Sequence, residues 1–172
     1  MRRHLTLAGV DATVSSAGVY EGGAPATAHG VATMADRGLD LEAHLSRRLD
    51  AAMVRQADLI IGMAREHVRE AAVLDRDVLP RTFTLKELAR EAKEVGPRPA
   101  GMPLDSWLGR IAAAREPGSL VGVGYHDDFD VEDPIGRGRP DYEKTADLID
   151  SLLERVVALA FPDGDHDQER SR

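Results

Sequence analysis

The chain has 172 residues and a formal net charge of -8, enough length for one domain with a buried core. Its negative charge opposes binding to nucleic acid or to an anionic membrane, so neither is expected as a partner. No stretch approaches the roughly 18–20 apolar residues of a membrane span, and the N-terminus lacks the apolar run of a signal peptide, which predicts a cytoplasmic protein.

The chain contains no cysteine. This excludes disulfides, thiolate zinc sites and a cysteine nucleophile within these residues.

Helices and short strands alternate along the chain. Apolar spacing and capping signals predict helices, in chain order, at residues 2–8, 24–38, 50–56, 65–74, 84–93, 105–115 and 142–161. Strands are predicted at 12–18 and 58–64, a strand or turn at 81–84, and a short helix or turn at 41–49. Thr84 with Glu87 three residues later is the capping-box pattern. The alternation predicts an α/β fold with a parallel sheet.

Residues 96–124 interrupt this rhythm, because Pro and Gly crowd both ends of the segment. We expect an inserted excursion or lid that is partly mobile. The surrounding residues, 1–161, are expected to form a single domain, and the polar tail 162–172 to be disordered.

Four pieces of sequence, in this order and at this spacing, resemble the low-molecular-weight protein tyrosine phosphatases. They are VSSAGVYEGGAPA (14–26), RGLDLEAHLSRRL (37–49), DLIIGMAREH (58–67) and DVEDPIG (130–136). In the family these correspond to the second strand with its loop, a His-x-Ala/Ser-Arg stretch, the third strand, and the loop of the Asp-Pro general acid. The resemblance implies a three-layer, Rossmann-like domain with a short parallel sheet of strand order 2-1-3-4, whose first strand is missing here.

The chemistry that the resemblance implies is phosphomonoester hydrolysis. The family's nucleophile is the Cys of a C-x-x-x-x-x-R loop after the first strand, whose backbone N–H groups and Arg hold the phosphate. Residues 1–8 align with the second half of the helix after that loop. The chain as written therefore cannot run the family mechanism, although its partner would be a phosphorylated protein or a small phosphomonoester. No cofactor is implied, and nothing predicts the oligomeric state.

Asp133 is the site residue that the resemblance singles out. It matches the family's general acid, which protonates the leaving group and then activates water, and Pro134 completes the Asp-Pro pair. The alternative is an ordinary Asp-Pro turn. Ile135 stands at a position of the cleft wall where the family usually has an aromatic residue.

Five further residues match family positions around the phosphate loop. Ser16 and His44 match a hydrogen-bond network that stiffens the loop, with a capping Ser and a surface His as the alternative. Arg47 matches the Arg of the His-x-Ser-Arg stretch and is expected to be structural. Tyr20 and Glu21 match one wall of the substrate cleft, where an exposed loop is the alternative.

The acidic stretch HDDFDVED invites a metal interpretation through His126, Asp127, Asp128 and Asp130. It lacks the Gly and Glu positions of an EF-hand loop, so a solvated acidic loop is expected and no metal. GRGRP (136–140) matches no phosphate-binding fingerprint and is expected to be a turn.

Three hypotheses of function remain open. The first is a phosphatase domain that is truncated at its N-terminus, for instance by a misplaced start codon, and is inactive. The second is a non-catalytic pseudophosphatase that binds or regulates. The third, an arsenate-reductase-like scaffold, is weaker because that chemistry needs several redox cysteines.

Overall fold

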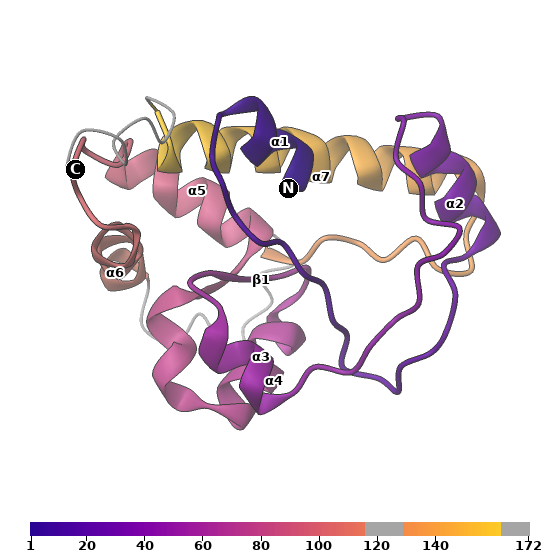
Figure 1. The fold of residues 1–172 in the computed structure, drawn as a ribbon, viewed down its shortest axis with the longest axis horizontal. Helices are drawn as coiled ribbons and strands as arrows, with labels where there is room; N and C mark the ends of the chain where they lie inside the picture. Colours follow the sequence, from indigo (N-terminus) through magenta and orange to yellow (C-terminus); the bar gives the residue numbers. More distant parts are fainter. Residues whose placement is uncertain (116–128, 163–172) are drawn as a thin grey trace.

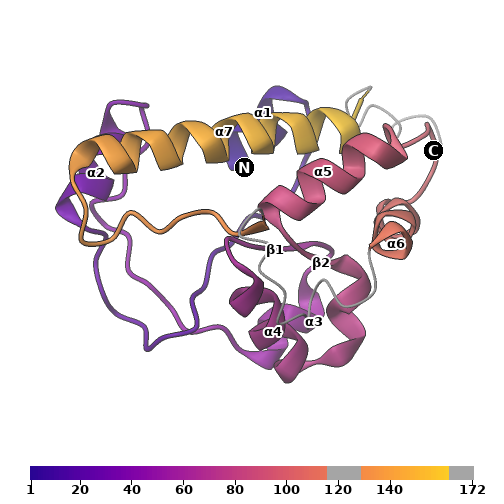
Figure 2. The same cartoon turned by 180° about the vertical axis from the view of Figure 1, so that it is seen from behind.

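The computed structural model describes residues 1–115 and 129–162. Its elements in chain order are α1 (Arg2–Leu7), α2 (Ala28–Ala35), α3 (Ala51–Gln56), β1 (Ile60–Gly62), α4 (Arg65–Leu74), the 3-10 helix η1 (Arg76–Arg81), β2 (Thr82–Thr84), α5 (Leu85–Val95), α6 (Leu104–Ala114) and α7 (Arg139–Ala160). The long helix α7 packs with α1, α2 and α5 on one side of the sheet, while α3 and α4 lie on the other (Figure 1; Figure 2 from behind). None of the described helices combines the length and the apolar character needed to cross a bilayer.

The described sheet has two parallel strands. Ile60 pairs with Thr82, Ile61 with Phe83 and Gly62 with Thr84. The parallel strand predicted at 58–64 is therefore confirmed. The four-stranded order 2-1-3-4 is not present in the described part of the chain, where the sheet consists of β1 and β2.

The strand predicted at 12–18 is wrong for this structure. Its one ladder contact is an isolated parallel bridge between Gly18 and Arg48. A strand needs a continuous neighbour, and the backbone around residue 18 pairs instead with the segment before α3. For the same reason residues 41–49 form no helix, because Ser46 uses its backbone groups on Ala24 and Gly23.

Local capping signals locate the helices well. The predicted helices at 65–74 and 50–56 are α4 and α3, the latter begun by Asp50, whose carboxylate accepts from Met53 N. The predicted capping box is present: Thr84 Oγ1 accepts from Glu87 N, and Glu87 Oε2 accepts from Thr84 N, each at 3.2 Å.

Helix α6 forms part of the core. It lies within the segment expected to be an insertion or lid, yet the side chains of Trp107, Leu108 and Ile111 are fully buried. They pack in one cluster with β2, α5 and α7, and Trp107 Nε1 donates to Gly96 O at 3.1 Å. Residues 116–124 of that segment and residues 163–172 of the tail lie outside the described residues.

Helix α1 docks on α7 through one apolar and one polar contact. Leu5 packs against Val157. His4 Nε2 lies 2.8 Å from Asp150 Oδ1, with Arg3 Nη2 3.3 Å from the same oxygen. The hydrogen bond from His4, supported by the charge of Arg3, lowers the pKa of the Asp150 carboxyl from its ordinary value.

We predict that Leu88→Ala lowers the free energy of unfolding by about 2–5 kcal/mol, because it opens a cavity in the fully buried core. Trp107 is the single tryptophan and is buried beside Leu88, so its fluorescence during urea titration measures the change. Val73→Ala, at a side chain that is 79% exposed, is the control and should change stability by less than about 0.5 kcal/mol. Equal effects of the two substitutions would contradict this core.

The His4–Asp150 pair makes stability depend on pH in a defined direction. Since the pKa of Asp150 is lowered in the folded state, its stabilisation is present above the unfolded pKa of about 3.9 and is lost as the pH falls through the folded value. The carboxylate is 50% exposed, so Asp150→Asn should cost only about 0.2–1 kcal/mol at pH 6. The difference in stability between the two proteins, measured by urea titration, should shrink as the pH is lowered below about 3.9, and a difference that stays constant over that fall would refute the pairing.

Candidate functional site

Asp133 lies in residues 129–138, the segment that leads into the start of α7. The segment is anchored where Val131 N donates to Met63 O at 2.7 Å, one residue after β1. The Asp133 carboxylate accepts a hydrogen bond from Ile135 N at 2.9 Å, so the Asp-Pro pair forms a tight turn. The Asp133 side chain is exposed, and in residues 1–115 and 129–162 no cation forms an ion pair with it.

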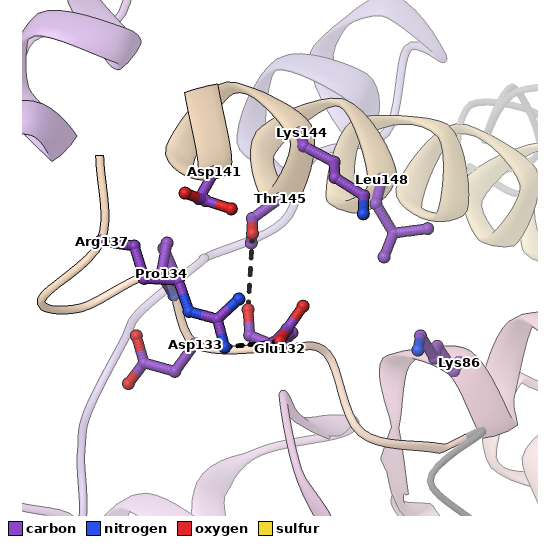
Figure 3. Close-up of a pocket in the computed structure, with 9 residues that line it drawn as sticks. All are labelled: Lys86, Glu132, Asp133, Pro134, Arg137, Asp141, Lys144, Thr145 and Leu148. Atoms are coloured by element: carbon purple, nitrogen blue, oxygen red, sulfur yellow. Dashed lines mark hydrogen bonds and ion pairs between the residues drawn. The ribbon is translucent and has the colours of Figure 1, made fainter. Parts of the chain in front are cut away.

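A cavity of about 240 Å³ opens beside this turn. Its walls come from Glu132, Asp133, Pro134 and Arg137, from Lys86 in the first turn of α5 and from the α7 side chains between Asp141 and Leu148 (Figure 3). Glu132 pairs with Arg137 at 2.6 Å across the opening. Asp133 and Lys86 lie on opposite sides of Glu132 (Figure 3), and Lys86 Nζ donates to Asp130 O.

Of the nine residues that line the cavity, the sequence indicated only Asp133 and Pro134 as site residues. Arg137, Lys144 and Thr145 belong to the turn and helix after the Asp-Pro pair. The GRGRP segment begins as the predicted turn, with Gly136 at φ +79°, but its last two residues, Arg139 and Pro140, already belong to α7. Two signals in the sequence could have indicated this wall. One is the basic residue three positions after Pro134, and the other is the pair of polar residues in the first two turns of the following helix.

Arg47 has a structural role in a pair of loops. Residues 18–24 and 46–49 exchange backbone hydrogen bonds, including Gly18 N to Arg47 O at 2.9 Å and Gly23 N to Ser46 O at 2.7 Å. Arg47 Nε donates to Ser16 O at 2.7 Å and extends this pairing. A Cβ atom on Gly22 would lie 3.0 Å from Arg47 Cα, so a larger residue there would push the two loops apart by a few tenths of an ångström.

Ser16 and His44 are both exposed in these loops. Among the described residues, no hydrogen bond joins the Ser16 hydroxyl to the His44 imidazole, and Ser16 is engaged through its carbonyl. Their proposed network stays a prediction.

The predicted cleft-wall residues are also at the surface. Tyr20 is 81% exposed and Ile135 is 66% exposed. Glu21 Oε1 lies 2.8 Å from Arg48 Nη1, which fixes its side chain against the other loop. Across the described ranges, no hydrogen bond or ion pair links Tyr20 or Glu21 to Asp133, and Ile135 contacts it through its backbone N within the turn, so the cleft wall stays a prediction as well.

Asp130 is committed to a protein contact, which accounts for one member of the acidic stretch. Its Oδ1 accepts from Arg65 N at 2.8 Å at the start of α4. In the part of the chain that the structure describes, no group of three His, Asp or Glu side chains could hold a metal ion. His126, Asp127 and Asp128 lie outside it.

Sequence comparison identifies relatives over the N-terminal part of the chain. The family model for low molecular weight phosphotyrosine protein phosphatase matches residues 1–95. The low molecular weight protein-tyrosine-phosphatase Etp of Escherichia coli K12 is 38% identical over 85 residues, which is 48% of this chain and 55% of that protein. The chain thus spans about half the length of the curated relatives that it matches.

Structure comparison extends the similarity to most of the chain. A YwlE mutant from Bacillus subtilis has a TM-score of 0.64 at 23% identity, covering 90% of this chain and 81% of that one. The low molecular weight protein tyrosine phosphatase from T. tengcongensis has a TM-score of 0.63 at 24% identity, covering 91% and 82%. Wzb from Vibrio vulnificus, in complex with benzylphosphonate, has a TM-score of 0.57 at 20% identity, covering 88% and 82%.

At these identities the solved structures establish the fold alone, an α/β fold like that of the low-molecular-weight phosphatases with a short parallel sheet. The family model covers more than half of the chain and agrees with it. The chain, which contains no cysteine, belongs to the low molecular weight phosphotyrosine protein phosphatase family.

Proposed function

We propose that this chain carries the general-acid half of a phosphomonoester hydrolase and is inactive without a nucleophile from outside its 172 residues. The observation that carries the proposal is Asp133, an exposed acid on an Asp-Pro turn beside a cavity, with no ion-pair partner in residues 1–115 and 129–162, in a member of the phosphatase family. The benzylphosphonate bound to Wzb supports an aryl phosphate as the substrate class.

The reaction needs two groups, and the chain has one of them. A thiolate attacks phosphorus, the P–O bond to the leaving group breaks, and the protonated acid gives its proton to the leaving oxygen. Water then attacks the phosphocysteine, the S–P bond breaks, and the acid takes the proton of the water. Asp133 fits the acid and base role in both steps, but the absence of cysteine removes the atom that would form the S–P bond.

The second candidate is a non-catalytic binding or regulatory module. It is favoured by the core, in which Phe83, Leu88, Trp107 and Val156 are all at most 1% exposed within the described residues. A chain that buries these side chains by itself can fold without the catalytic half of the domain. The two candidates differ in whether a longer protein encoded in the same reading frame has phosphatase activity.

We predict that the purified 172-residue chain does not hydrolyse p-nitrophenyl phosphate above the buffer rate between pH 5 and pH 8. The reason is the missing nucleophile. The parallel sample is any longer protein encoded in the same frame with an upstream C-x-x-x-x-x-R motif, which should be active. Turnover by the short chain would refute the cysteine mechanism, and a folded, inactive chain with no such motif upstream would establish the binding module.

We predict that Asp133→Asn in the cysteine-bearing protein lowers kcat/KM for phenyl phosphate by about 100- to 10,000-fold, the usual contribution of a general acid. The loss should be smaller for p-nitrophenyl phosphate, because p-nitrophenolate leaves with less need of a proton. Asp147→Asn, at a side chain 74% exposed on α7, is the matched control and should leave both rates unchanged. Equal losses with both substrates would argue against proton donation by Asp133.

A further inference from the structure

Asp130 caps a helix that lies 65 residues away in the sequence. The residue at the N-cap position of α4, Ala64, makes no side-chain cap hydrogen bond. Asp130 Oδ1 takes this role by accepting from Arg65 N at 2.8 Å. The Arg65 guanidinium also reaches both carboxylate oxygens at 3.4 Å, so the contact combines a cap with a two-point ion pair.

The residues on each side of Asp130 are fixed to the same part of the fold. Lys86 Nζ donates to Asp130 O at 2.7 Å. Val131 is buried, and its backbone N donates to Met63 O at 2.7 Å. Phe129 is 7% exposed, with the guanidinium carbon of Arg90 4.2 Å from its ring centroid. Residues 129–131 are therefore tied to β1, α4 and α5 together.

The contacts to the sheet and to α4 and α5 end directly after this anchor. Glu132 and Asp133 are exposed, and the hydrogen bond that joins Glu132 O to Thr145 Oγ1 is long, at 3.4 Å. The position of the acid turn relative to the sheet is thus set mainly by residues 129–131. Of the three, Asp130 makes the contact with a full charge, and its side chain is 34% exposed against 19% for Arg65.

We propose that Asp130 is the positioning residue for the general acid Asp133, an inference that rests on the proposed function. A general acid has to lie within hydrogen-bond reach of the leaving oxygen, and displacement by about 1 Å can cost on the order of 100-fold in rate. By capping α4, Asp130 fixes the start of the acid turn three residues before the reacting carboxyl group. It touches no substrate and acts through Asp133.

The first test uses the 172-residue chain and amide hydrogen exchange measured by NMR. Asp130→Ala should speed exchange at Arg65, Val131 and Ile135 by about tenfold or more, the effect of losing a charge-assisted hydrogen bond. Asp130→Asn should restore most of the protection, because its side-chain oxygen can still accept from Arg65 N.

Asp75→Ala is the matched control. Asp75 also caps a helical turn, through Asp77 N at 3.0 Å, and pairs with Arg55 at 2.9 Å. It should leave exchange at Val131 and Ile135 unchanged. Unchanged exchange at those two amides in Asp130→Ala would show that Asp130 does not hold the turn and would overturn the proposal. An equal rise in exchange throughout α5 and α6 would overturn it as well, because Asp130 would then stabilise the whole fold rather than the turn.

The second test uses the cysteine-bearing protein and compares phenyl phosphate with p-nitrophenyl phosphate. Asp130→Ala should lower kcat/KM more for phenyl phosphate, in the same direction as Asp133→Asn, and Asp130→Asn should recover part of it. An equal loss for both substrates would overturn the positioning role. If Asp133→Asn itself shows no dependence on the leaving group, the proposed function fails, whereas the exchange experiment still decides whether Asp130 holds the turn.

Discussion

The buried carboxylate of Glu87 is the point on which the rest of this fold depends. Its side chain is 4% exposed, and it closes the capping box with Thr84 while Oε1 lies 2.6 Å from Arg115 Nε. Arg115 also donates to Thr82 O at 2.7 Å and lies over the Phe83 ring at 4.8 Å. One carboxylate therefore caps the start of α5 directly after β2 and also binds Arg115, the residue at the C-cap of α6. Leaving either charge unpaired in this environment would cost about 3–5 kcal/mol.

Helix α5, which begins at this point, makes two kinds of contact: apolar packing in the core and polar contacts with the segment before Asp133. Its apolar face, which includes Leu88 and Ala92, packs on α6 and α7. Lys86 Nζ donates to Asp130 O, and the Arg90 guanidinium lies over the Phe129 ring, so both contact the segment just before the acid turn. The placement of Asp133 therefore follows from core packing, because the helix that supplies the anchor is the helix that fills the centre of the molecule.

The features that were predictable from the sequence are those whose causes lie within a few residues. The Thr84–Glu87 box, the Asp50 cap and the apolar run of β1 are local signals, and each element was found where it was predicted. The lack of a strand at 12–18 and of a helix at 41–49 was not predictable, because the backbone of residues 18–24 pairs with that of residues 46–49. Asp130 was considered as a metal ligand for a related reason: its partner, the start of α4, is 65 positions away, and no pattern in the sequence connects the two.

The anchoring of the acid turn has a consequence for how activity could be lost or gained in this family. Within the described part of the chain, the contacts that fix residues 129–131 come from the end of β1, α4 and α5. None of them requires a phosphate or a cysteine, so the placement of the acid and the presence of the nucleophile are physically separate properties. A chain without the nucleophile can keep its acid turn in order, and joining a nucleophile to it would not require rebuilding the turn. A well-formed Asp133 turn therefore reports on the fold. A catalytic role for Asp133 can be judged only in a protein that also has the thiolate.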